Sequence, residues 1–454
     1  MSRLRCAGVL ALRLGLVALS ACHRSAVASL DSGPAAQGDA SNPAEEASVP
    51  ARCTWKPTAA STPSLCDVVE VGESVATARA GEVAFGVVES HAAALVASVV
   101  RAGAGTASTV VLGDACRPTE APQPFATGAG LFAAACVRPD RPKTAVGAAP
   151  TRHVPSPLAV FRVDTESYER LVELPGSPES YDVIGGAGHE LGALLVWGED
   201  DEAPAPGSSV PVVGGLKLAA ISADLRTVSA MHPVVDTKGA QDPRLALREG
   251  GYWLTWVATR PEHPEVAPSG EVEVSSEERA FAWLEVISLD AKGTPVGQAR
   301  ALTSSTGHLG GYAAWAHGGA LELIAGDGVH GKEGGSLLRL IVHPDGSVEP
   351  ASPLASGVDV GTPPSVVAGP TGRAWVSYVD RAGDPRLLSL DGAAPSRASQ
   401  EPSLATGRML AVAPGPEPLV AFAVLQGMTP PGGRGGAPTT DACAWSFRWA
   451  SCAP

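Results

Sequence analysis

The first residues of the chain place a thiol where a peptidase and an acyltransferase could act on it. A cationic segment at 1–5 precedes apolar runs at 7–12 and 14–21, and Cys22 follows directly. These runs are too short for a membrane-spanning helix, which needs about 20 uninterrupted apolar residues. The small residues just before the cysteine suit cleavage by a signal peptidase. We therefore predict a signal peptide over 1–21, whose removal leaves Cys22 at the N-terminus.

The residues Leu19-Ser20-Ala21-Cys22 resemble the lipobox of bacterial lipoproteins. The resemblance implies that Cys22 is lipidated and anchors the chain in a membrane, since each buried CH₂ contributes about 0.8 kcal/mol. In that family an Asp after the cysteine is an inner-membrane retention signal. His23 stands there instead, so the resemblance implies an outer-membrane lipoprotein, facing the periplasm or the surface. Arg13 interrupts the apolar segment and departs from the pattern, so an ordinary signal peptide is the alternative.

The segment after Cys22 differs in composition from the rest of the chain. Ala, Ser, Gly, Pro and Glu dominate it, and aliphatic residues are few. Such a segment cannot bury enough apolar surface to offset the entropy of ordering it. We predict a lipidated cysteine and a disordered tether over 22–50, followed by a β-propeller-like domain over 51–454. That length is ample for one large β domain.

Six cysteines remain once Cys6, in the signal peptide, and Cys22 are set aside: Cys53, Cys66, Cys116, Cys136, Cys443 and Cys452. An even number in an exported chain indicates disulfide bonds. Their spacing forms three local pairs, which favours the bonds 53–66, 116–136 and 443–452. The alternative is a ring-closing bond from Cys53 to Cys443 or Cys452. Because no C-x-x-C pair occurs, a cysteine metal site is not expected.

The composition and motifs argue against several classes of protein. The formal net charge is −14, and an acidic chain repels phosphate backbones, so nucleic acid is not an expected partner. No G-x-S-x-G elbow, P-loop or EF-hand loop occurs, and His189-Glu190 lacks the second histidine of a zincin helix. No catalytic residue, metal or cofactor is therefore assigned, and a non-enzymatic role is favoured.

Two features could bind a metal ion and a third is a long insertion. The acidic run 199–202 offers clustered oxygens for Ca²⁺, although a solvated loop is the commoner outcome for such runs. The acidic insertion 262–278 is typical of a flexible loop. Three histidines and an aspartate also crowd one unit, without the spacing of a compact metal motif: His308, His317, His330 and Asp327.

After residue 66, short apolar or alternating runs are broken by turns, in a chain with 52 glycines and 40 prolines. A fixed order recurs. A Gly-rich turn leads to an apolar strand that ends in an aromatic residue, and then come a loop, a second strand and a turn with an aspartate. The clearest copies lie at 250–293 and 372–392. The turns carry Asp224, Asp290, Asp345 and Asp391.

A period of roughly 45–65 residues with several strands per unit predicts an all-β fold, a β-propeller of six or seven blades. Paired β-sandwiches are the alternative. The alternating segment 444–449 predicts a strand that completes the first blade and closes the ring. Tryptophans recur at similar places in the copies, which favours packing between blades over sugar binding: Trp197, Trp253, Trp256, Trp283, Trp315 and Trp375.

Taken together, these features predict a membrane-anchored lipoprotein of the cell envelope that acts as a non-catalytic binding or scaffold module. Its expected partners are the membrane, through the lipid anchor, and an envelope protein or a glycan. The alternative is an extracellular polysaccharide hydrolase or lyase, which needs convergent carboxylates near the propeller axis. A third hypothesis is that the protein is a component of a larger surface assembly.

Overall fold

Every regular element that this computed structural model describes is a β-strand, which confirms the predicted all-β class. The described residues are 52–60, 64–65, 68–76, 82–89, 94–101, 107–114, 116, 122–138, 158–164, 167–174, 181–189, 191–200, 213–261, 280–328, 334–368, 374–390, 396–397, 408–413, 419–426 and 442–453. Within these ranges, no helix has the length and apolar character that crossing a membrane requires.

Seven antiparallel sheets are built from the described residues, and in six of them four strands follow one another along the chain. We call these six sheets blades 1 to 6. Blade 1 contains β3 (Val68–Ala76), β4 (Glu82–Glu89), β5 (Ala94–Arg101) and β6 (Ala107–Asp114). Blade 2 contains β7 (Gln123–Thr127), β8 (Gly130–Cys136), β9 (Leu158–Val163) and β10 (Tyr168–Glu173). Blade 3 contains β11 (Tyr181–His189), β12 (Gly192–Asp200), β13 (Val213–Ile221) and β14 (Val228–Pro233).

The next three blades repeat the same order. Blade 4 contains β15 (Gln241–Arg248), β16 (Gly251–Pro261), β17 (Ala280–Asp290) and β18 (Pro295–Ala301). Blade 5 contains β19 (Leu309–His317), β20 (Ala320–Asp327), β21 (Gly335–Val342) and β22 (Ser352–Val358). Blade 6 contains β23 (Ser365–Ala368), β24 (Ala374–Val379), β25 (Pro385–Ser389) and β26 (Ser396–Arg397).

Blade 7 joins the two ends of the folded domain. Its first three strands are β27 (Arg408–Ala413), β28 (Leu419–Gln426) and β29 (Ala442–Ala453). The early strands β1 (Arg52–Ala60) and β2 (Ser64–Leu65) pair with the outer edge of β29. The predicted strand at 444–449 is thus part of β29, and the N-terminal β1 completes this last blade rather than β29 completing the first.

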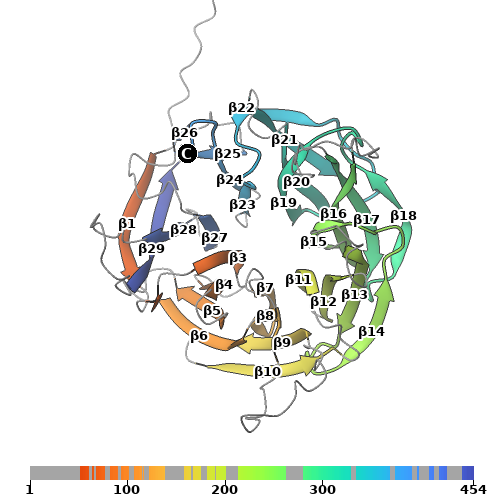
Figure 1. The fold of residues 1–454 in the computed structure, drawn as a ribbon, viewed down its shortest axis with the longest axis horizontal. Helices are drawn as coiled ribbons and strands as arrows, with labels where there is room; N and C mark the ends of the chain where they lie inside the picture. The colour runs from red at the N-terminus through yellow and green to blue at the C-terminus, as the bar shows by residue number, and fades with distance from the viewer. Residues whose placement is uncertain are drawn as a thin grey trace, which may run out of the picture. The chain divides into compact units, whose positions relative to one another are not determined.

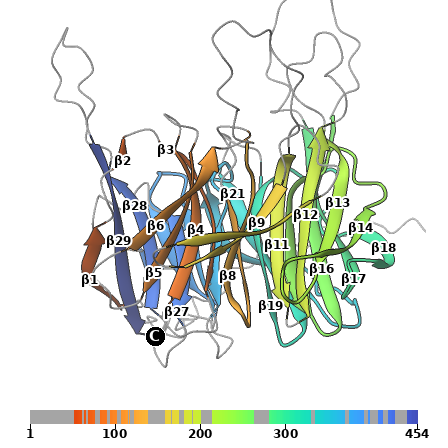
Figure 2. The same cartoon turned by 90° about the horizontal axis from the view of Figure 1, so that it is seen from below.

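The first strands of the blades form a closed circle within this domain. Each of β3, β7, β11, β15, β19, β23 and β27 packs against the first strand of the next blade, and β27 packs against β3. Figure 1 shows these strands nearest the centre, with the later strands of each blade outside them. Figure 2 shows the strands running between the two faces of the ring. Four-stranded meanders arranged in this way are a β-propeller, here with seven blades among the described residues.

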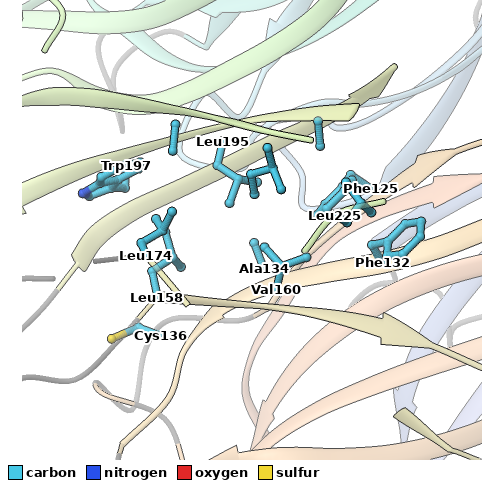
Figure 3. Packing of buried hydrophobic residues seen from close by; sticks show 13 residues of the cluster. Phe125, Phe132, Ala134, Cys136, Leu158, Val160, Leu174, Leu195, Trp197 and Leu225 are labelled. Carbon is cyan, nitrogen blue, oxygen red and sulfur yellow. The ribbon is translucent and has the colours of Figure 1, made fainter. Parts of the chain in front are cut away.

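Among the described side chains of blades 1 to 6, the core lies between neighbouring blades, since each buried cluster joins residues of two adjacent sheets. Between blades 2 and 3, for example, Phe132 and Val160 pack against Leu195 and Trp197 (Figure 3). The predicted packing role of the tryptophans is confirmed where they are buried: Trp197, Trp253, Trp256 and Trp375 are each at most 1% exposed. Burying a large aromatic side chain in this way stabilises a domain by about 1.5–3 kcal/mol.

Tight turns fix the register inside the blades. Gly318 and Gly319 join β19 to β20 with φ of +59° and +81°, the pair of positive angles that a two-residue hairpin turn of type I′ requires. The recurrent aspartates also stand at one equivalent place, the connection from the third strand to the fourth. The carboxylates of Asp224, Asp290 and Asp345 accept a hydrogen bond from the amide two residues further on, at 3.1, 2.8 and 2.8 Å. Asp391 lies outside the described residues.

Candidate functional site

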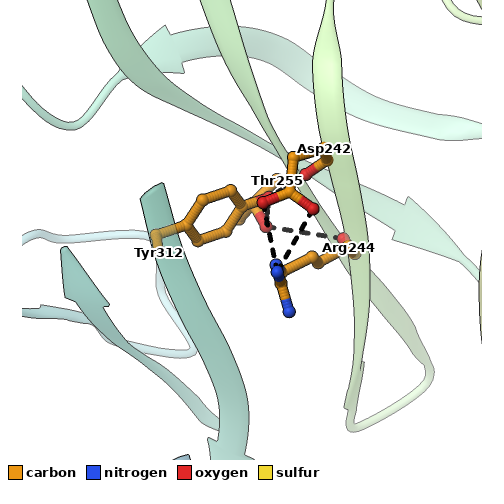
Figure 4. A network of polar contacts seen from close by, with 4 residues as sticks. All are labelled: Asp242, Arg244, Thr255 and Tyr312. Carbon is orange, nitrogen blue, oxygen red and sulfur yellow. Dashed lines mark hydrogen bonds and ion pairs between the residues drawn. The ribbon is translucent and has the colours of Figure 1, made fainter. Parts of the chain in front are cut away.

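Four polar residues meet where the inner strands of blades 4 and 5 lie side by side. We call Asp242, Arg244, Thr255 and Tyr312 the polar cluster (Figure 4). Asp242 and Arg244 are in β15, Thr255 is in the neighbouring β16, and Tyr312 is in β19. Because β15 and β19 belong to the inner circle of strands, the cluster lies beside the axis of the ring.

The backbone at Asp242 is unusual, since its φ is +46°. A non-glycine residue rarely adopts this left-handed region, although Asp and Asn tolerate it better than others. Pro243 follows directly, and proline is accepted here because β15 is an edge strand of its sheet. The Asp242 side chain is 42% exposed, whereas that of Arg244 is 14% exposed. The cluster therefore presents a carboxylate to its surroundings and keeps the guanidinium behind it.

Hydrogen bonds hold this arrangement from both blades. The Arg244 Nη2 group donates to both carboxylate oxygens of Asp242, at 3.2 and 3.1 Å. The Tyr312 hydroxyl donates to the backbone carbonyl of Asp242 at 2.7 Å and lies 3.0 Å from Thr255 Oγ1. The Arg244 guanidinium also lies over the Tyr312 ring, 5.0 Å from its centroid. A strained residue held by this many contacts is preorganised, as binding sites often are.

The phenol of Tyr312 stays protonated under all ordinary conditions. Burial raises its pKa far above the usual value, the charge of Asp242 raises it further, and Arg244 partly opposes the shift. A permanently protonated phenol acts as a hydrogen-bond donor, which is the role that the contact with the Asp242 carbonyl requires. The cluster is thus built to position a charged group rather than to exchange protons through this tyrosine.

A second group of side chains, which we call the rim patch, stands at the same end of blade 4. It consists of Arg260, Phe281, Trp283 and His308. The Arg260 guanidinium lies over the rings of Phe281 and Trp283, 5.4 and 6.0 Å from their centroids. Phe281 and His308 are 5.6 Å apart by ring centroids. Cation–π and aromatic contacts of this kind suit stacking on planar or ring-shaped ligands.

The polar cluster and the rim patch lie on the face of the ring that receives the long connections. In every blade the second strand ends, and the third begins, at the end where the first strand starts. The chain segments 139–157, 201–212, 262–279 and 427–441 join second strands to third strands. Their positions in the chain place their ends on one face, which we call the long-loop face. The first-to-second connections of the opposite face are as short as two residues.

The histidine set that the sequence singled out is not brought together. His308 precedes β19 and His317 ends it, so the two are nine residues, about 30 Å, apart along the strand. Asp327 pairs with Leu309 near the His308 end, and His330 lies outside the described residues. In the part of the chain that the structure describes, no group of three or more His, Cys, Asp or Glu side chains could hold a metal ion.

Two of the acidic features fall largely outside the described residues. Of the run 199–202, Glu199 and Asp200 end β12 and the next two residues are outside. The insertion 262–278 is outside as well.

The polar cluster itself was missed by the sequence reasoning. Its available signal was a charged Asp-Pro-Arg triplet at 242–244, directly before the apolar residues 245–247.

Of the predicted disulfide bonds, the structure contains one and excludes another. The predicted bond between Cys116 and Cys136 is formed. The predicted bond between Cys443 and Cys452 is wrong, because both residues belong to the continuous strand β29 and are nine residues apart. That separation is about 30 Å along a strand, whereas a disulfide needs Cα atoms roughly 4.4–6.8 Å apart.

Comparison with known proteins adds little beyond this geometry. No family model matches the chain, and no curated protein matches it. Among solved structures, a prolyl endopeptidase, from work on two such enzymes, has a TM-score of 0.41 and 12% identity over 78% of this chain. This chain covers 45% of that protein's length. Hydrazine synthase of Kuenenia stuttgartiensis has a TM-score of 0.38 and 12% identity, covering 68% of this chain and 74% of its own.

These low values carry no argument about activity. The assignment of the fold therefore depends on the molecule itself, namely on the repeated four-stranded sheets and on the closed circle of inner strands. The domain of this protein is a β-propeller.

Proposed function

We propose that this protein is a lipoprotein of the cell envelope whose propeller binds a protein or glycan partner at the long-loop face. The observation that carries the binding role is the polar cluster, where a strained aspartate is held at the inner circle of strands by contacts from two blades. Loops and strand ends displayed by a rigid scaffold are where binding residues concentrate. The rim patch adds an aromatic and cationic surface beside it.

The anchoring part of the proposal depends on the N-terminal sequence. Leu19-Ser20-Ala21-Cys22 supports lipidation of Cys22, and the residue after it supports sorting to the outer membrane. A lipid anchor keeps the propeller outside the cytoplasm and leaves the ring available to envelope components. In a detergent-phase partition, the wild-type protein is expected in the detergent phase and the Cys22→Ser variant in the aqueous phase. Equal partition of the two forms would contradict the anchor.

The binding role is tested with Cys22→Ser protein, the full chain in a form that does not need detergent. Immobilised protein is incubated with envelope extract, and captured proteins and glycans are quantified by mass spectrometry. A second sample carries Asp242→Asn, which removes the charge and keeps a residue that accepts positive φ. The control is Met231→Ala, on the outer strand β14, where the side chain is 40% exposed.

The proposal expects a partner that the control retains and the Asp242→Asn variant captures at least tenfold less. Identical capture by all three forms would place binding elsewhere and contradict a role for the polar cluster. Turnover of an envelope polysaccharide by the purified protein would replace the binding role with the hydrolase or lyase alternative.

A further inference from the structure

The closing blade places two cysteines directly opposite each other. In the antiparallel pair of β1 and β29, the register partner of Cys53 is Cys452. Directly opposite residues in such a pair have Cα atoms about 4.5–5.5 Å apart. This separation lies inside the range of roughly 4.4–6.8 Å that disulfide bonds span. The register therefore satisfies the distance requirement for a bond without any movement of the backbone.

The same strand excludes the local pairing of Cys452 with Cys443, because both lie in β29 and are nine residues apart. That separation is about 30 Å along an extended strand. At the other end, Ser64 is the register partner of Cys443, so Cys53 and Ser64 lie at opposite ends of β29, about 30 Å apart. Cys66, the other partner predicted for Cys53, lies outside the described residues.

We propose that Cys53 and Cys452 form a disulfide bond that closes the propeller ring covalently. Two S–H bonds break and one S–S bond forms. The two protons and two electrons pass to the oxidised form of a thiol–disulfide oxidoreductase, whose own disulfide becomes two thiols. Such oxidants act on exported proteins, so the reaction depends on the export that the signal peptide predicts.

The position of the bond gives it a specific role. The sheet of blade 7 joins strands from opposite ends of the chain through the pairing of β1 with β29, in addition to the packing of β27 against β3. β1 lies at the outer edge of the sheet and pairs with one strand only. The disulfide would tie this edge strand to the ring and prevent the blade from opening at the seam.

Peptide mapping of the full chain, purified from an oxidising compartment, tests the bond. Free thiols are alkylated under denaturing conditions, and the protein is digested without reduction. Trypsin cuts after Arg448 and separates Cys443 from Cys452, and chymotrypsin cuts after Trp55 and separates Cys53 from Cys66. The proposal expects one linked pair containing Cys53 and Cys452. Alkylated Cys53 or Cys452, or either residue linked to another cysteine, would overturn it.

Variants give a second measurement that does not depend on the digest. Cys53→Ser, Cys452→Ser and the double variant are expected to share one lowered midpoint of thermal unfolding, because each removes the same bond. In the presence of a reductant, their midpoints and that of the wild type should converge. The matched control is Cys116→Ser, whose effect should add to theirs, since it breaks a separate bond. Additive effects of Cys53→Ser and Cys452→Ser would contradict a shared bond.

Discussion

Blade 5 contains an ion pair between a buried carboxylate and a partly exposed guanidinium, at a position where other blades have apolar side chains. Glu322 is the third residue of β20, and Arg339 is the register partner of the residue two positions after it. The equivalent pairs in blades 2, 3 and 4 are Phe132 with Val160, Leu194 with Leu218, and Trp253 with Val286. All six of these side chains are buried and face the next blade. Glu322 and Arg339 thus occupy a packing position between blades 5 and 6.

The geometry of the pair sets the expected magnitude. Arg339 donates to Glu322 Oε2 through Nε at 3.1 Å and through Nη2 at 2.6 Å. The Glu322 side chain is 9% exposed and that of Arg339 is 29% exposed. Removing one partner of a fully buried pair costs about 3–5 kcal/mol, and replacing both with apolar residues is often neutral or stabilising. We expect a smaller cost where Arg339 is the partner left unpaired, because its partly hydrated side chain can move its charge toward water.

We therefore expect three different outcomes at pH 7. Glu322→Leu lowers the free energy of unfolding by about 2 kcal/mol, because Arg339 is left unpaired but partly hydrated. Arg339→Leu lowers it by about 3 kcal/mol, because the more buried carboxylate is left with His317 alone, 3.2 Å away. The double variant, which gives blade 5 the leucine pair of blade 3, returns to within about 1 kcal/mol of the wild type.

Denaturant unfolding followed by tryptophan fluorescence and by circular dichroism measures these values, provided that the two probes coincide. At about 2.1 cal/mol/K for each of roughly 400 residues, a loss of 2 kcal/mol also lowers Tm by about 2–3 °C. Glu349→Gln is the control, since its contact with His343 joins two half-exposed side chains and is worth less than about 1 kcal/mol. A double variant less stable than either single variant would refute the reasoning.

Three further outcomes follow from contacts in other blades. Tyr312→Phe should lower the free energy of unfolding by about 1–3 kcal/mol in the same assay, because the Asp242 carbonyl loses its donor. Stability should fall as the pH drops below about 4, because burial raises the pKa of Asp380 but its partner Arg386 outweighs this and lowers it. A depressed pKa stabilises the fold above the unfolded value and loses that effect in acid, so Asp380→Asn should flatten the profile from pH 5 to 2. Removing the Cys116–Cys136 bond, which closes 20 residues, should cost about 3 kcal/mol, seen without reductant as a lower unfolding midpoint of Cys116→Ser than of the wild type.

The fold was predictable from the sequence because its signals are local. Strand runs and Gly turns recur along the chain, and aspartates stand at the third-to-fourth connections of blades 3, 4 and 5, so the pattern predicts a propeller before any contact is known. The buried tryptophans follow for the same reason, since a side chain at a recurrent strand position meets the same neighbour in each blade. The polar cluster was not predictable in this way. Asp242 and Tyr312 are 70 residues apart, and the positive φ of Asp242 within a strand has no local sequence signal of its own.

The cysteines show most clearly where local reasoning stops. Short spacing favoured the bond between Cys443 and Cys452, but spacing along a chain becomes distance in space only when the segment between can turn back. That segment is a single extended strand, whose length keeps its ends about 30 Å apart. A propeller closed by strands from both chain ends instead brings the most distant cysteines together. In a ring of blades, therefore, cysteines near the two termini should be paired across the closing sheet before neighbours in sequence are considered.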